Sequence, residues 1–117
     1  MIKYFPNTFF PNIFVGAAFC EKDYLQELKR LKIDQPDTFI SKAASAKRIY
    51  KKDGVGATFI ICFDAVNNKK LDRNQVAALI CHEAVHISDW IFEDIGENKV
   101  GMETRAYLVQ YIVQQTL

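Results

Sequence analysis

The chain has 117 residues, enough for one domain with its own core and too few for two. Half of the residues are hydrophobic and a quarter are charged, which excludes a disordered, collagen-like or disulfide-scaffold protein. The formal net charge of +1 gives no reason to expect nucleic acid or an anionic membrane as a partner. We therefore expect a single domain over residues 1–117.

The charge is unevenly divided along the chain. Residues 1–70 contain 12 Lys and Arg against 7 Asp and Glu, which gives +5, whereas residues 71–117 contain 3 against 7, which gives −4. We interpret the basic cluster of the first part as a solvated strand face and not as a nucleic-acid surface. The acidic second part suits the capture of a cation.

The chain contains three cysteines, an odd number without C-x-x-C spacing: Cys20, Cys62 and Cys81. We expect free, buried thiols and a reducing, cytoplasmic environment. The uncharged segment 4–20 loosely resembles a signal peptide, but Pro6 and Pro11 interrupt any apolar helix, so we expect no such peptide. No apolar run is long enough for a membrane-spanning helix.

The first half of the chain predicts an extended arm, a strand and a helix, in that order. The aromatic and Pro-rich residues 1–12 are expected to form an arm that covers the core. The apolar run 13–19 is a strand candidate. A helix is expected from Asp23, which stands as an N-cap with Gln26 three residues later. Residues 34–36, Asp-Gln-Pro, should end this helix.

The middle of the chain carries a β-hairpin signal. Two extended runs, 46–52 and 57–63, flank the Gly-containing turn 53–56. The first run is the more polar and should lie near an edge of the sheet. The second is almost wholly apolar, as expected for a central strand that is buried on both faces.

A long helix is predicted from Asp72, whose capping-box partner is Gln75, to a C′ residue at Gly96. A last helix should run from about Met102 towards Leu117. One apolar stripe follows the long helix: Val76, Ile80, Ala84, Ile87, Ile91 and Ile95. The predicted fold class is α+β, a small, mostly antiparallel sheet packed against this central helix and the closing C-terminal helix.

The long helix contains the sequence His82-Glu83-Ala84-Val85-His86. Residues four apart lie on the same face of a helix, so His82 and His86 can direct their imidazoles at one metal ion. Glu83 lies beside them without binding the metal and can act as the base that activates water. These are the only two histidines in the chain. The pattern predicts a divalent-metal site, most naturally zinc.

Two histidines leave the coordination of zinc incomplete, so another residue must contribute. Glu93 follows His86 by about 10 Å along the helix axis, too far to share the ion. The short Asp89 side chain better suits a hydrogen bond to a ligating imidazole. The link after Gly96 can stretch about 20 Å, enough for the chain to return and present Glu103 as the third ligand. The alternative for Glu103 is an acid in a first helical turn, favoured by the helix dipole.

His82-Glu83-x-x-His86, followed by Glu103 and then Ala106-Tyr107, resembles the gluzincin metallopeptidases, in particular minimal, often bacterial or phage-encoded domains. The resemblance covers about residues 56–117. It implies a zincin-like fold, zinc as cofactor, and a peptide or protein substrate. It also implies His82, His86 and Glu103 as zinc ligands and Glu83 as general base.

Three functions remain open. The first is a zinc metallopeptidase whose extended substrate lies along an exposed strand near Tyr50 or Phe59. The second is a catalytically silent, zinc-stabilised binding or regulatory module, which would close the fourth zinc position that an enzyme keeps open. The third is an α+β protein without metal. Tyr107 is either a stabiliser of the oxyanion or, as we favour, a core tyrosine.

Overall fold

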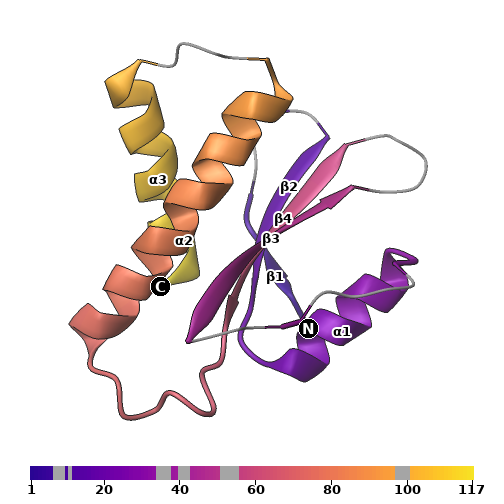
Figure 1. The fold of residues 1–117 in the computed structure, drawn as a ribbon, viewed down its shortest axis with the longest axis vertical. Coiled ribbons are helices and arrows are strands. Elements are labelled where there is room, and N and C mark those ends of the chain that lie inside the picture. Colours follow the sequence, from indigo (N-terminus) through magenta and orange to yellow (C-terminus); the bar gives the residue numbers. More distant parts are fainter. Residues whose placement is uncertain (7–9, 11, 34–37, 40–42, 51–55, 97–100) are drawn as a thin grey trace.

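One sheet, covered by helices on both faces, forms the protein (Figure 1). The helix α1 (Glu21–Arg30) packs on one face, whereas α2 (Arg73–Asp94) and α3 (Met102–Thr116) pack on the other. This confirms the α+β class and adds a third layer, because α1 was not expected to cover a face of its own. The computed structural model describes residues 1–6, 10, 12–33, 38–39, 43–50, 56–96 and 101–117.

The sheet has four strands in the order β1-β2-β4-β3 among the described residues. The outer pairings, β1 with β2 and β3 with β4, are antiparallel. The central strands β2 and β4 are parallel, so the expectation of a mostly antiparallel sheet is wrong at the centre. The connection from β2 to β4 passes through α1 and β3, which is long enough for a parallel return. The strands are β1 (Lys3–Tyr4), β2 (Ile13–Ala18), β3 (Ala44–Tyr50) and β4 (Ala57–Phe63).

Strand β4 is the buried centre of the sheet. Phe59, Ile61 and Phe63 point into the core beneath α2 and α3, whereas Ile60 and Cys62 point into the core beneath α1. Alternating side chains of a strand point to opposite faces, and here both faces are covered. The predicted hairpin, the central position of this strand and the edge position of β3 are confirmed. The turn residues 53–55 lie outside the described residues.

The N-terminal arm joins the sheet as its other edge. Tyr4 pairs with Gly16 of β2. A Cβ atom at Gly16 would lie 2.8 Å from the carbonyl oxygen of Lys3, so only glycine lets β1 approach this closely. Ile2 and Phe5, on either side of β1, are buried in opposite cores. The described part of the arm therefore covers the core as expected.

Helix α1 begins at Glu21, three residues earlier than expected, because an N-cap at Asp23 would have made Tyr24 the first helical residue. Its N-cap is Cys20, which makes no side-chain capping hydrogen bond. The predicted cap, Asp23, lies in the first turn, where its carboxylate accepts from the N-terminal amine of Met1 at 2.7 Å. The N-cap prediction was wrong: the helix already includes Asp23, whose carboxylate binds the N-terminal amine.

The end of α1 is set by its own backbone. Lys32 adopts a left-handed conformation with φ 60°, and the N–H of Ile33 donates to the carbonyl of Leu28 at 2.9 Å. This is the Schellman arrangement, which terminates the helix before the predicted stop. Residues 34–36, which were expected to provide that stop, lie outside the described residues.

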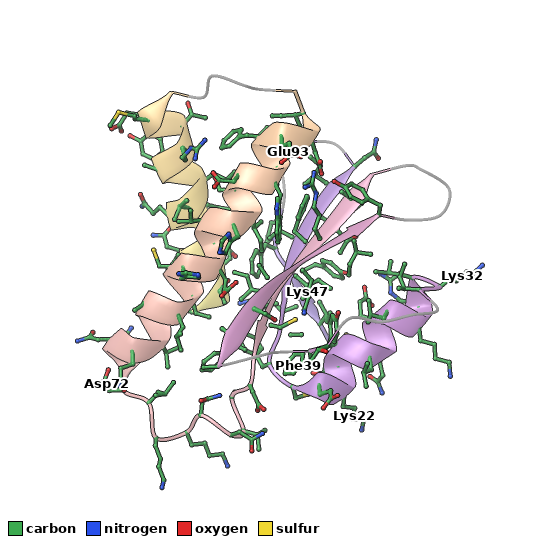
Figure 2. The ribbon with its side chains drawn as sticks, viewed as in Figure 1. Lys22, Lys32, Phe39, Lys47, Asp72 and Glu93 are labelled. Carbon is green, nitrogen blue, oxygen red and sulfur yellow. The ribbon has the colours of Figure 1, made fainter. Side chains whose placement is uncertain are left out.

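Helix α2 has the predicted boundaries. The N–H of Gln75 donates to the Asp72 carboxylate at 2.8 Å, and the Gln75 side chain accepts from the N–H of Asp72 at 2.9 Å. Gly96, with φ 78°, follows the C-cap Ile95. Asp72 and Glu93 lie near the two ends of the helix (Figure 2). The capping box and C′ glycine predictions are confirmed, as is the start of α3 at Met102.

The apolar stripe of α2 forms the central part of the main core. Ile80, Ala84, Ile87 and Ile91 are buried there, whereas Ile95 is exposed beyond the helix end. The stripe prediction therefore holds except at its last position.

The prediction for the cysteines holds only in part. All three thiols are free, but Cys62 is buried, Cys20 is half-buried and Cys81 is exposed. One residue after the buried Ile80, the backbone has turned about 100° around the helix, which carries Cys81 out of the core.

Candidate metal centre

The two histidines of the predicted site lie together on the exposed face of α2. Their Nε2 atoms are 3.3 Å apart, and the ring planes are inclined by 72°. A tetrahedral metal with bonds of 2.0–2.1 Å needs its two nitrogen ligands about 3.3–3.4 Å apart. In the structure this contact is a hydrogen bond between the two imidazoles, which a metal ion would replace; the separation of the two nitrogens is that of two ligands of one zinc ion.

Glu83 lies beside the histidines on the side of α2 that turns towards the sheet. Its side chain is only 9% exposed. Burial raises the pKa of the Cys62 thiol on β4 to about 12, and the negative charge of Glu83 contributes to this rise. The Glu83 carboxylate is thus largely shielded from bulk water. Glu83 follows His82 directly in the helix.

An aromatic column adjoins the histidines. The Trp90 indole lies 6.1 Å from the His86 ring at an interplanar angle of 27°, and 6.4 Å from the Phe59 ring at 22°. The Arg48 guanidinium of β3 lies 5.9 Å from the same indole. Sequence reasoning missed Trp90 and Arg48. The spacing of four from His86 to Trp90 was a usable signal, whereas nothing in the sequence connects Arg48 to α2.

A groove of about 400 Å³ runs along the edge strand β3 and reaches Trp90. Tyr50, 52% exposed, lines it, and Arg48 contributes a cation. The other suggested substrate contact, Phe59, is wrong: it is fully buried on β4, one strand away from the edge. The residues that line the groove are Tyr24, Leu28, Ile33, Ala46, Lys47, Arg48, Ile49, Tyr50 and Trp90.

One end of this groove is tied to α2 by polar contacts. The Tyr50 hydroxyl donates to the Asp94 carboxylate at 2.7 Å, and Arg48 forms an ion pair with the same carboxylate. Arg48 also lies 3.5 Å from Glu93. Partial burial and the bond to Asp94 raise the pKa of Tyr50. These contacts hold the edge strand against the helix that carries the histidines.

The structure does not bring Glu103 to the histidines. Glu103 is exposed in the first turn of α3. Ile112, nine positions or two and a half turns later, is fully buried, so Glu103 projects from the opposite, outer face of α3. Arg105 contacts α2 instead, through an ion pair with Asp89. Among the described residues, no cluster of three or more His, Cys, Asp or Glu side chains could hold a metal ion.

Asp89 and Tyr107 do not have the roles that we favoured for them from the sequence. Asp89, expected to hydrogen-bond to an imidazole, is engaged by Arg105. Tyr107 is 65% exposed, so its interpretation as a core residue is wrong. It borders a pocket of about 220 Å³ together with Phe10 and Phe92, in a different cavity from the β3 groove.

Comparison of the chain with protein-family models, curated proteins and solved structures finds no match. The site must therefore be judged on its own chemistry. Among the helices of the described residues, none combines the length and hydrophobicity needed to cross a membrane.

Proposed function

We propose that this protein is a zinc-dependent metallopeptidase of the gluzincin type. The observation that supports this most directly is the 3.3 Å separation of the His82 and His86 Nε2 atoms, which matches two ligands of a tetrahedral ion. Imidazole nitrogens favour zinc over calcium or magnesium, which prefer oxygen ligands. A bound zinc ion would supply Lewis-acid polarisation of water and of a peptide carbonyl.

In this proposal Glu83 is the general base and then the general acid. Its carboxylate would accept a proton from the attacking water and return it to the leaving amine nitrogen. Its position directly after His82 on α2 supports the role, because it keeps the carboxylate beside the two proposed ligands.

The groove along β3 is the proposed substrate site. An extended peptide can add to an exposed sheet edge through main-chain hydrogen bonds, and β3 is such an edge. The groove reaches Trp90, which adjoins His86, so a peptide seated there would pass close to the histidines.

Glu103 is the proposed third ligand, on the basis of the gluzincin resemblance. Glu103 projects from the outer face of α3, so this assignment rests on the resemblance and not on the position of the side chain. Loss of zinc affinity in Glu103→Ala would support the assignment, and unchanged affinity would remove Glu103 from the proposed site and leave His82 and His86 as its proposed ligands.

The decisive experiment compares wild type with Glu83→Gln, which keeps size and hydrogen-bonding capacity but removes the base. Zinc-loaded proteins are incubated with a broad peptide library, and cleavage is read by mass spectrometry. We expect Glu83→Gln to retain zinc and to lose at least about 10²-fold in rate, as is typical for a lost general base. Glu93→Gln, which replaces an exposed acid of the same helix that is neither the proposed base nor a proposed ligand, is the matched control and should cleave like wild type.

The outcomes separate the candidate functions. Cleavage in wild type and Glu93→Gln only would support the peptidase. Cleavage by all three proteins would come from a contaminant. Zinc bound by all three with no cleavage would contradict the peptidase and favour the zinc-stabilised binding module.

A further inference from the structure

Trp90 is the place where three elements meet. Its indole lies nearly parallel to the His86 ring on α2 and to the Phe59 ring on β4, and the Arg48 guanidinium of β3 lies 5.9 Å from it. Phe59 is fully buried, so the ring on which Trp90 packs is held in place by the core. The two ring separations, 6.1 and 6.4 Å, are within the range of offset aromatic pairs.

The same residue belongs to two sites at once. Trp90 lines the β3 groove and also stacks on His86. His82 and His86 are exposed, and the described contacts that restrain the His86 ring are those with His82 and Trp90. An exposed imidazole without a restraining neighbour would lose side-chain entropy on binding a metal. A stacked indole reduces that loss by holding the ring in place beforehand.

We propose that Trp90 is a positioning residue: its indole holds the His86 imidazole ready for metal binding and forms the wall shared by the metal site and the β3 groove. This inference rests on the proposed metal site and does not require peptide hydrolysis. It predicts that an aromatic side chain at position 90 is needed for full zinc affinity, although Trp90 donates nothing to the ion.

The first test measures zinc affinity by competition with a chromophoric chelator in wild type, Trp90→Phe and Trp90→Leu. Trp90→Leu should weaken zinc binding by about 3- to 10-fold, the affinity equivalent of one offset aromatic pair. Trp90→Phe restores a stacking ring and should lie within about twofold of wild type. Tyr107→Leu, the loss of an exposed aromatic ring on α3 that borders a different pocket, is the control and should leave affinity unchanged.

The second test uses Trp90 as its own reporter, because it is the single tryptophan of the chain. A Co²⁺ ion bound at the Nε2 atom of His86 would lie within roughly 10 Å of the indole, given metal–nitrogen bonds near 2 Å. Stoichiometric Co²⁺ should therefore quench the tryptophan fluorescence of wild type. His86→Ala should abolish the quenching.

Each result supports or overturns the inference. Zinc affinity of Trp90→Leu equal to wild type overturns it, as does an equal loss in Trp90→Phe and Trp90→Leu. If Trp90→Leu does not fold, the cobalt experiment decides: bound cobalt without quenching in wild type overturns the inference. Wild type that binds neither metal refutes the proposed metal site and this inference together, whereas zinc binding that is indifferent to Trp90 refutes only the latter.

Discussion

Zinc should stabilise the folded protein through His82 and His86. Both histidines are exposed, so replacing either of them with alanine should change the stability of the metal-free protein little. Replacement of an exposed residue usually changes stability by less than about 0.5 kcal/mol. In the presence of a chelator, His82→Ala and His86→Ala should therefore melt within a few degrees of wild type. Any larger difference on adding zinc must then come from metal binding.

The expected magnitude follows from ligand linkage. Zinc at about 100 times its dissociation constant stabilises the native state by about 2.7 kcal/mol, provided that the unfolded chain does not bind it. For a domain of this size, 1 kcal/mol shifts the melting temperature by about 3–6 °C. Wild type should therefore gain about 8–16 °C, and either histidine variant should lose most of this gain.

The assay is thermal unfolding followed by circular dichroism, with chelator, with zinc and with Mg²⁺. Magnesium prefers oxygen ligands and should give no shift. The reasoning is refuted if wild type shows no zinc-dependent shift under conditions where zinc is in excess. It is equally refuted if the two histidine variants keep the full shift, because zinc would then bind elsewhere.

The other two predictions concern the acids of the site and the thiols. In a competitive chelator titration, Glu103→Ala should weaken zinc affinity substantially while Glu93→Ala leaves it nearly unchanged, and the reverse ranking would show that Glu103 is not the ligand. At pH 8 a disulfide reagent should modify the exposed Cys81 readily but Cys62 only after unfolding, because burial raises the pKa of the Cys62 thiol to about 12. Burial of the neutral Cys62 thiol contributes stability below pH 9 that is lost between pH 9 and about 12, so a denaturation midpoint that rises over this interval would contradict the assignment.

The sequence by itself determined the features that depend on residues a few positions apart. The capping box of Asp72 and Gln75 and the left-handed Gly96 define α2, and both were predicted. The spacing of His82 and His86 placed them on one face because a helix returns to the same side every 3.6 residues. The almost wholly apolar run 57–63 likewise predicted which strand of the hairpin would be buried on both faces.

Only the tertiary structure decided how these pieces meet. The parallel pairing of β2 with β4, the layer formed by α1 and the stack of Trp90 on Phe59 join residues far apart in the chain. The ion pair of Arg48 with Asp94 spans 46 positions. No local pattern selects such contacts, because they depend on which surfaces bury the most apolar area in the finished core.

The orientation of α3 about its own axis is the clearest example of a feature that the sequence did not determine. The helix has a broad apolar surface. Leu108 and Ile112 are buried in the core, Val109 and Val113 are half-buried and pack against it, and Met102, Ala106, Val109 and Val113 border a hollow that Cys81 of α2 also lines. Because apolar residues occupy so much of the surface of α3, the spacing of these residues in the sequence does not determine which side of the helix packs against α2. In the folded protein Leu108 and Ile112 are the residues of α3 that are buried in the core. Glu103 therefore lies on the opposite side of the helix and faces outwards. The sequence determined that Glu103 begins the helix, but packing determined which way it faces.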